Sequence, residues 1–185
     1  MNGMKKLFIC SDIHGDAESA KKIIDAFERE ECDKILILGD ILYHGPRNDL
    51  PCGYAPKKVI ELLNCYKEKI IAVRGNCDAE VDQMVLEFPI LADSTRIYVD
   101  GICIFATHGH IYNKGSCSFL QKGDVLLHGH THVPAAESFG NGNYYINPGS
   151  TSIPKENSYK GYIVYQNREF IFKTLEGDIY NSITV

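Results

Sequence analysis

Short polar motifs rich in aspartate and histidine recur along this chain, and most of them follow directly after an apolar run. In order they are Asp12-x-His14, Gly39-Asp40, Gly75-Asn76, His108-Gly109-His110 and Gly129-His130-Thr131-His132. Five of the seven histidines lie inside these motifs. Carboxylate, amide-carbonyl and imidazole ligands in this combination favour a pair of divalent transition ions over calcium or a structural zinc. The series therefore predicts a dinuclear metal hydrolase.

Strand-like and helix-like patterns alternate through the first part of the chain. Continuous apolar runs at residues 7–10, 34–38 and 70–73 are typical of strands buried on both faces. Apolar residues recur at helical spacing over residues 20–27, and Pro56 opens a second helical pattern, since proline suits a first turn. This β-α-β-α-β order predicts a parallel sheet with right-handed crossovers.

Ligands of such a sheet gather outside the carboxyl ends of its strands. Asp12, Asp40 and Asn76 each follow one of the three runs, so we expect these side chains to converge at one edge of the sheet. Asp40 is the central member, and its two carboxylate oxygens can bridge ions about 3.5–4 Å apart.

The remainder of the chain is richer in strands. Runs at residues 102–106 and 124–127 lead into the two histidine motifs, and residues 161–174 form a predicted hairpin that turns at 166–168. A second sheet packed on the first would accommodate these strands. We therefore expect a single domain over residues 1–185, an α/β sandwich of two mixed β-sheets flanked by helices, with the metal site at the strand carboxyl ends.

The spacing within the last motif carries its own prediction. Alternate side chains of an extended segment point the same way, so His130 and His132 would reach one site while Thr131 points elsewhere. Gly109 and Gly129 would let the backbone pass close to the ions, where a Cβ would intrude.

The composition limits the partners of the chain. The formal net charge is -5 and no long run of Lys or Arg is present, whereas proteins that hold long nucleic acid usually show a basic face. The seven cysteines are odd in number and include no Cys-x-x-Cys pair, which favours reduced thiols and a cytoplasmic location. The N-terminal apolar stretch is too short for a signal peptide or a membrane span, so we expect no membrane association.

Taken in order, the motifs resemble those of the calcineurin-like metallophosphoesterase superfamily. The similarity is greater to the small bacterial YfcE-type phosphodiesterases. It rests on the loop His44-Gly45-Pro46-Arg47-Asn48 after Asp40, on Gly75-Asn76-Cys77-Asp78 and on Asn147-Pro148-Gly149-Ser150. A single Gly-His-x-His motif would be weak evidence, but five motifs in the family's order are specific.

The resemblance implies a metal-dependent phosphodiesterase with two divalent ions. Manganese is the expected metal, and iron, zinc, nickel and cobalt also tolerate such ligands. A hydroxide bridging the ions would attack the phosphorus of a small phosphodiester in line. The implied ligands are Asp12, His14 and His132 for one ion and Asn76, His108 and His130 for the other, with Asp40 bridging.

The chain departs from many relatives at Cys77. They carry Gly-Asn-His-Asp, in which the histidine is thought to assist the leaving group. A thiol has a reference pKa of about 8.5 and donates hydrogen bonds weakly, so diesters and good leaving groups are favoured. We expect Cys77, Asp78 and His110 to act in catalysis, although His110 could equally bond the backbone. His128 is expected in the core or beside the ligands.

The connection over residues 43–55 is long, and long ordered loops often have a function. We expect His44, Arg47 and Asn48 to contact the substrate, because the arginine fork suits a phosphate. The alternative is a purely structural Pro-Gly turn.

Other functions share parts of this pattern. A phosphomonoesterase or phosphatase of the same fold would differ only in its substrate pocket. The net negative charge of the chain disfavours a nuclease. A non-catalytic scaffold resembling the retromer subunit Vps29 would have lost ligand positions, and none is lost here. The sequence leaves a homo-oligomer open.

Overall fold

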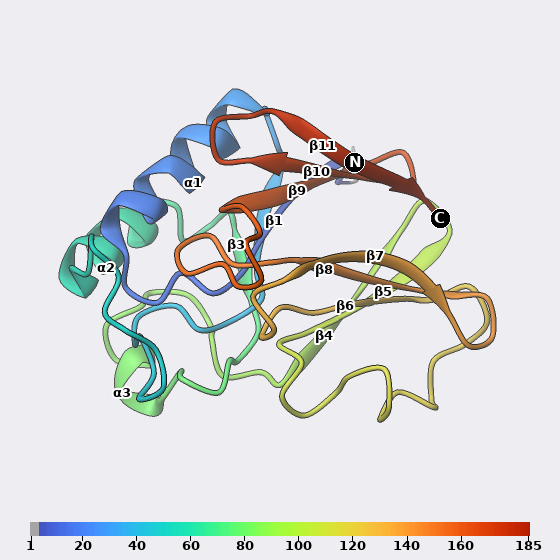
Figure 1. The fold of residues 1–185 in the computed structure, drawn as a ribbon, viewed down its shortest axis with the longest axis horizontal. Coiled ribbons are helices and arrows are strands. Elements are labelled where there is room, and N and C mark those ends of the chain that lie inside the picture. Colours follow the sequence, from blue (N-terminus) through green and yellow to red (C-terminus); the bar gives the residue numbers. More distant parts are fainter. Residues whose placement is uncertain (1–3) are drawn as a thin grey trace.

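Two mixed β-sheets lie face to face, and helices cover the outer face of one of them (Figure 1). The computed structural model describes residues 4–185. The strand order is β11-β10-β9-β1-β2-β3 in the first sheet and β4-β5-β6-β8-β7 in the second. The predicted α/β sandwich of two mixed sheets is therefore confirmed.

Parallel neighbours occupy one side of the first sheet and the centre of the second. The first sheet consists of β1 (Lys6–Cys10), β2 (Lys34–Ile37), β3 (Ile70–Ala72), β9 (Gly161–Gln166), β10 (Glu169–Thr174) and β11 (Ile179–Thr184). The second consists of β4 (Ser94–Val99), β5 (Ile102–Thr107), β6 (Val125–Leu127), β7 (Pro134–Phe139) and β8 (Asn143–Pro148).

Two of the three helices in residues 4–185 correspond to the helical patterns predicted from sequence. α1 (Ala17–Arg29) follows Asp16, whose carboxylate accepts the N–H groups of Glu18 and Ser19 and so caps the first turn. α2 (Pro56–Asn64) opens on its proline, as predicted. α3 (Glu80–Gln83) is a single short turn.

Side chains of β1 alternate between two cores. Phe8 and Cys10 face the helices, whereas Leu7 and Ile9 face the second sheet, and all four are fully buried. Burial on both faces explains why this run is apolar at every position.

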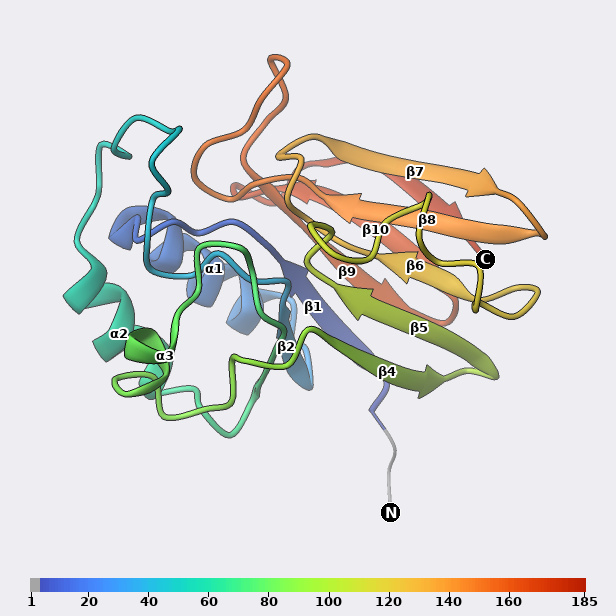
Figure 2. The same cartoon turned by 90° about the horizontal axis from the view of Figure 1, so that it is seen from below.

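A loop covers the outer face of the second sheet. This loop connects β5 and β6 (Figure 2). Its Cys117 and Leu120 pack on Phe105, Leu126 and Tyr145 of that sheet. Helices therefore flank the sandwich on one side only.

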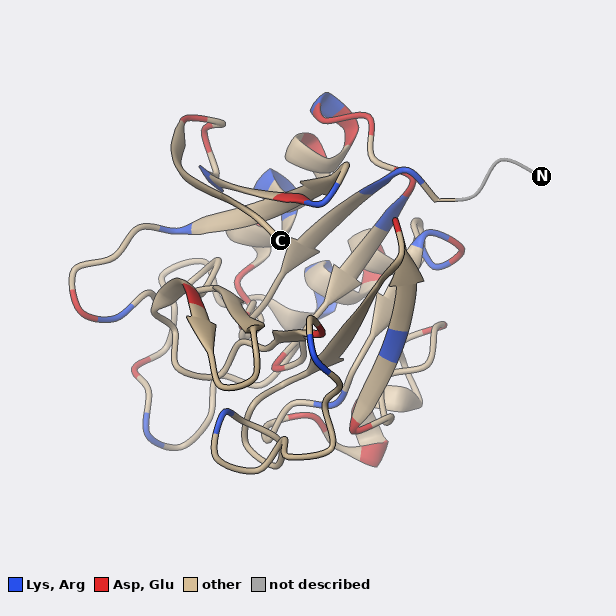
Figure 3. Ribbon diagram, turned by 90° about the vertical axis from the view of Figure 1, so that its right-hand side faces the viewer, with Lys and Arg blue, Asp and Glu red and all other residues tan. Residues whose placement is uncertain are grey.

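Charges and thiols are dispersed through the fold. Lys and Arg residues are scattered among acidic residues over several elements (Figure 3). All seven cysteines are free thiols, and four of them are buried. None of the helices in residues 4–185 has the length and apolar character needed to cross a membrane.

Glu30 forms a nearly buried charged cluster at the end of α1, and this cluster should make stability depend on pH. Its Oε1 accepts hydrogen bonds from Lys173 Nζ at 2.7 Å and from the Tyr162 hydroxyl at 2.8 Å. Burial opposes the charge of Glu30, but these bonds outweigh it and lower the pKa of the carboxyl below its usual 4.5.

Replacing Glu30 with glutamine should lower the free energy of unfolding at pH 7 by about 1.5–3 kcal/mol, the value of hydrogen bonds to a charged group. Because the folded pKa is depressed, this contribution is present above pH 4.5 and is lost as the pH falls through the folded pKa. Urea unfolding at pH 7 and at successively lower pH measures the difference. The exposed control Glu61→Gln should change stability by less than about 0.5 kcal/mol. A gap between wild type and Glu30→Gln that did not narrow in acid would contradict this account.

Candidate metal centre

The predicted ligands come from both sheets and meet at one edge of the sandwich. Each follows the carboxyl end of a strand that has a parallel neighbour. β1, β2 and β3 supply the ligands of the first sheet, and β5 and β6 supply those of the second. In chain order they are Asp12, His14, Asp40, Asn76, His108, His130 and His132.

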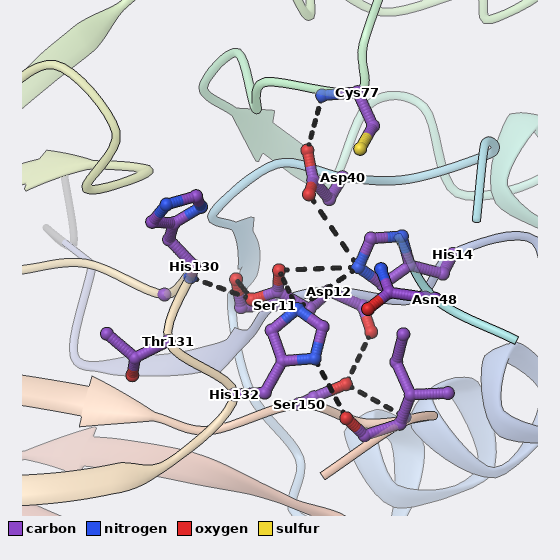
Figure 4. Close-up of polar contacts among 12 residues, drawn as sticks. Ser11, Asp12, His14, Asp40, Asn48, Cys77, His130, Thr131, His132 and Ser150 are labelled. Carbon is purple, nitrogen blue, oxygen red and sulfur yellow. Dashed lines mark hydrogen bonds and ion pairs between the residues drawn. The ribbon is translucent and has the colours of Figure 1, made fainter. Parts of the chain in front are cut away.

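Asp12, His14 and His132 form the first group of candidate ligands. Nε2 of His132 lies 3.1 Å from Oδ1 of Asp12 and 3.3 Å from Nε2 of His14. Oδ2 of Asp40 lies 3.6 Å from Nε2 of His14 (Figure 4). One carboxylate and two imidazoles thus point at a common position.

His108, Asn76 and His130 form the second group. Nε2 of His108 lies 3.0 Å from Oδ1 of Asn76, 3.2 Å from Nδ1 of His130 and 3.4 Å from Oδ2 of Asp40. The same Asp40 oxygen therefore faces both groups. The other Asp40 oxygen accepts the N–H of Cys77 at 2.8 Å, which fixes the carboxylate between them.

Three of the histidine rings are oriented by backbone carbonyls. A carbonyl can only accept, so Nδ1 of each ring donates the proton and Nε2 is left facing the site. The bonds run from His14 to Tyr43, from His108 to Leu38 and from His132 to Ile153, at 2.7, 2.6 and 2.8 Å.

Asp12 offers an oxygen that no donor satisfies. Its Oδ2 accepts hydrogen bonds from the Ser11 hydroxyl at 2.6 Å and from the His130 N–H at 3.0 Å. Its Oδ1 is buried and has no hydrogen-bond partner among residues 4–185. A buried carboxylate oxygen without a donor, facing imidazole nitrogens, fits a bound cation.

The electrostatics of the cluster also favour positive charge. Burial opposes ionisation of Asp12, but interactions with His132 and His14 hold the pKa of its carboxyl well below the usual range. Burial likewise disfavours a charge on His108, yet the neighbouring Asp40 carboxylate raises the pKa of this histidine to about 9. The ionised carboxylates of Asp12 and Asp40 therefore make this buried cluster attractive to cations.

Five of the candidate ligands have left-handed backbone conformations. Their φ angles are 57° at Asp12, 50° at His14, 54° at Asp40, 67° at His130 and 62° at His132. Such conformations cost of order 1–3 kcal/mol each and cluster at functional sites. The fold therefore holds the ligand-bearing loops in shapes that their local sequence disfavours.

The segment from His130 to His132 is not extended, and this part of the prediction was wrong. Both histidines have positive φ, so the chain turns between them and each ring joins a different group. Thr131 does point away from the ligand rings, as predicted, and its hydroxyl accepts a hydrogen bond from the Asn147 amide at 3.0 Å (Figure 4). Gly129 permits this path as predicted, because a Cβ there would lie 1.9 Å from the hydroxyl oxygen of Ser11.

A cleft of about 870 Å³ opens in front of the two ligand groups. Arg47 and Asn48 line it, as the sequence predicted for substrate contacts. Arg74 and Lys155 line it as well, so three cations face the site of an acidic chain. No motif distinguishes Lys155, which is an exposed loop residue before β9.

Residues 4–169 match the model of the calcineurin-like phosphoesterase superfamily domain. The chain belongs to this superfamily. Phosphodiesterase YfcE of Escherichia coli strain K12 is 46% identical over 164 residues, which cover 89% of each protein. Phosphodiesterase MJ0936 of Methanocaldococcus jannaschii is 28% identical over 162 residues, or 80% of this chain and 89% of that protein.

Solved structures extend the comparison to the fold. The structure of E. coli YfcE, described as a phosphoesterase, has a TM-score of 0.93 and 43% identity over 97% of this chain and 98% of that one. Vps29 from Entamoeba histolytica, solved with zinc, has a TM-score of 0.60 and 19% identity over 96% and 98% of the two chains. The second likeness is one of fold alone.

Cys77 borders the cleft beside Asp40 (Figure 4). Burial and the Asp40 carboxylate raise the pKa of the Cys77 thiol.

Asp78 holds the ligand loops together. Its carboxylate accepts the N–H groups of Asp40, Ile41 and Gly75 at 2.8, 2.8 and 2.7 Å and is almost completely buried. Because both oxygens are committed to the backbone, we interpret Asp78 as a positioning residue and not as the catalytic group expected from sequence.

The remaining histidines lie around the ligands. His44 packs edge-on between Tyr43 and Tyr54, with ring centroids 4.7 and 5.4 Å away, and is absent from the cleft lining. The expected substrate contact of His44 therefore has no structural support. Its carbonyl accepts a hydrogen bond from the Asn48 side chain at 2.8 Å, so it shapes the loop.

His110 and His128 flank the second ligand group. The His110 ring lies 5.4 Å from that of His108, and His110 is not among the residues that line the cleft, so its expected catalytic role stays a prediction. His128 is buried against Tyr145, as expected of a core histidine, and burial lowers its pKa to about 4.

Ser150, in the turn after β8, connects two ligands. Its hydroxyl donates to the carbonyl of Asp12 at 2.8 Å and accepts the N–H groups of Ser152 and Ile153 at 3.2 and 3.0 Å. The Ile153 carbonyl in turn orients His132. Loss of this hydroxyl should therefore loosen Asp12 and His132 together.

The variant Ser150→Ala should bind divalent ions about 10–100-fold more weakly, the usual effect of removing an outer support of a metal ligand. Calorimetric titration of chelator-treated protein with manganese measures the change. Ser19→Ala removes a similarly buried hydroxyl from α1 and should leave metal affinity unaltered. Equal affinities of Ser150→Ala and wild type would show that the turn does not position the ligands.

Proposed function

We propose that this chain is a phosphodiesterase that uses two divalent metal ions. The observation that carries the proposal is the shared Asp40 oxygen, which faces two groups of ligand atoms at 3.4 and 3.6 Å. The kinship with YfcE of E. coli, a named phosphodiesterase, supports the reaction class.

Each ligand group would hold one ion. Two ions bound there would supply the charge that activates a water molecule and neutralises the phosphate. Asp40 would serve both ions, while the carbonyl-bound histidines present Nε2 without reorganisation. The proposed ligands are Asp12, His14 and His132 for one ion and Asn76, His108 and His130 for the other.

The cleft residues would bind and orient the substrate. Arg47, Arg74 and Lys155 bring positive charge to the mouth of the site, which favours the anionic phosphate and charge that develops on it. Asn48 is held by the His44 carbonyl and can donate a second hydrogen bond into the cleft.

The residue type at position 77 supports a diesterase. A thiol donates hydrogen bonds weakly and is a poorer proton donor to a departing alkoxide than an imidazole. Esters whose leaving groups depart as stabilised oxyanions depend less on such a donor. Cys77 would therefore act through its small size at the edge of the cleft.

Other elements of the proposal are broader. Manganese is the proposed metal, and iron, zinc, nickel or cobalt would suit the same ligands. The substrate would be a small phosphodiester rather than long nucleic acid, in keeping with the net charge of -5.

A cytoplasmic location is supported by seven free cysteines. We further propose that residues 1–185 act as a single domain.

The test is hydrolysis of bis(p-nitrophenyl) phosphate and of p-nitrophenyl phosphate by chelator-stripped protein before and after manganese is added. We expect no turnover without metal and faster turnover of the diester once metal is restored. Turnover that survives stripping would overturn the metal mechanism, and a preference for the monoester would make the enzyme a monoesterase. No turnover with any of the five metals, together with no calorimetric metal binding, would support the scaffold alternative.

A further inference from the structure

A second, apolar pocket adjoins the metal cleft. It encloses about 410 Å³, within the range of about 300–1,000 Å³ of small-molecule sites. Its lining residues come from α2, from α3 and from the loop that follows Asp40. None of the mechanism described above uses this pocket.

The walls of the pocket come from three segments. The floor is the buried Leu42, α2 contributes Pro56 and Ile60, and α3 and the residues after it contribute Val81 and Val85. Tyr43 and Tyr54 add two aromatic rings to the lining, and Lys57 and Asp82 are its charged members.

The two cavities share part of their lining. Tyr43, Cys77 and Ala79 belong to both. A molecule whose phosphate lies at the ligand groups can therefore extend past Cys77 into the apolar pocket. A histidine at position 77 would place a larger and more polar side chain at this passage, so the small thiol keeps it open and apolar.

Apolar side chains are unusually exposed around this pocket. Tyr43 is 41% exposed, Val81 64% and Val85 43%. Contiguous exposed apolar groups next to a polar site mark binding surfaces. Because these side chains lie beside the proposed phosphate site, we expect them to bind part of the substrate rather than a separate partner.

We propose that this apolar pocket binds an aromatic ester group of the phosphodiester substrate. The inference rests on the proposed function and narrows its substrate class to diesters with at least one aromatic substituent. The two tyrosines favour a flat ring, because aromatic pairs gain energy from stacked or edge-to-face contact beyond the apolar area they bury. The charged Lys57 and Asp82 leave room for a polar edge on that ring.

The experiment compares diphenyl phosphate with dimethyl phosphate. Both are monoanions with the same phosphate oxygens, so their difference in affinity reports the substituents alone. Dissociation constants are measured by calorimetry on manganese-loaded protein, and hydrolysis of bis(p-nitrophenyl) phosphate is measured on the same samples. We expect diphenyl phosphate to bind at least about tenfold more tightly than dimethyl phosphate, from burial of one ring.

Two variants that add the same charge test whether the preference for diphenyl phosphate arises in the apolar pocket. Val81→Asp places a carboxylate in the pocket wall and should reduce the preference for diphenyl phosphate to less than about threefold, while dimethyl phosphate binds as before. Met84→Asp adds the same charge three residues away, at a side chain that is 84% exposed and outside the pocket lining, and should keep the preference. Both sites are exposed, so both variants should fold.

The possible failures are distinguishable. If the diester is hydrolysed but diphenyl and dimethyl phosphate bind equally, or if Val81→Asp and Met84→Asp keep the same preference, the aromatic subsite is wrong and the phosphodiesterase stands. If the diester is not hydrolysed under any metal, the proposed function is wrong, whatever the binding constants show.

Discussion

Replacing Asp40 with asparagine should lower kcat/KM for a phosphodiester by more than about a thousandfold, because the metal charge organised by this residue is worth several kcal/mol in the transition state. Asparagine keeps the oxygen that accepts the Cys77 N–H. It replaces the oxygen that faces both ligand groups with an amide nitrogen, which cannot bind a cation. Steady-state kinetics with manganese, together with metal content per protein, measures the effect.

Thermal unfolding of the Asp40→Asn variant and a matched control separate a loss of activity from a loss of folding. Loss of the Asp40 charge leaves His108 without its buried partner, so chelator-treated Asp40→Asn should unfold cooperatively but with a lower thermal midpoint than wild type. The matched control Asp25→Asn changes the same functional group on the exposed side of α1 and should retain full activity. Wild-type kcat/KM in Asp40→Asn would rule out the two-ion mechanism.

Replacing Cys77 with histidine should raise the ratio of monoester to diester turnover by about a hundredfold, the lower end of the range for general acid catalysis. The imidazole would supply a proton to the leaving group, which the thiol does poorly. It would also narrow the passage to the apolar pocket, which should raise KM for aromatic diesters. The ratio of kcat/KM values for β-glycerophosphate and bis(p-nitrophenyl) phosphate reports both effects, because only the monoester releases a poor alkoxide leaving group that depends on a proton donor.

Cys65→His is the matched control, because Cys65 is an exposed thiol at the end of α2. The ratio of monoester to diester turnover in Cys65→His should equal that of wild type. An unchanged ratio in Cys77→His would mean that position 77 does not set the choice between monoesters and diesters.

Continuous apolar runs made half of the fold predictable. The strands β1, β2, β3, β5 and β6 are buried on both faces, and their sequences contain little else than apolar residues. Four strands were not foreseen. β4, β7 and β11 are edge strands with mostly half-buried or exposed side chains, and β8 is a central strand whose sequence, NYYINP, has no continuous apolar run. Pro134 at the start of β7, which lacks an N–H, suits an edge but gives no strand signal.

The sequence predicted which residues form the candidate site better than it predicted the conformation of the loops that carry them. The order of the motifs identified the ligands, since each motif ends a buried strand. The turn at His130 was missed because positive φ at a histidine is imposed by tertiary contacts, here by Gly129 packed against Ser11. Lys155 and the apolar pocket were missed because both depend on segments far apart in the sequence.

The origin of the ligands in both sheets has a mechanical consequence. Ions bound between Asp12 on one sheet and His132 on the other would fasten the two layers at one end, while the rest of their contact is apolar packing. A small sliding of one sheet over the other would displace every ligand group at once. Side chains deep between the sheets, such as Ile104 and Val125, therefore set the alignment of the reaction centre without touching it.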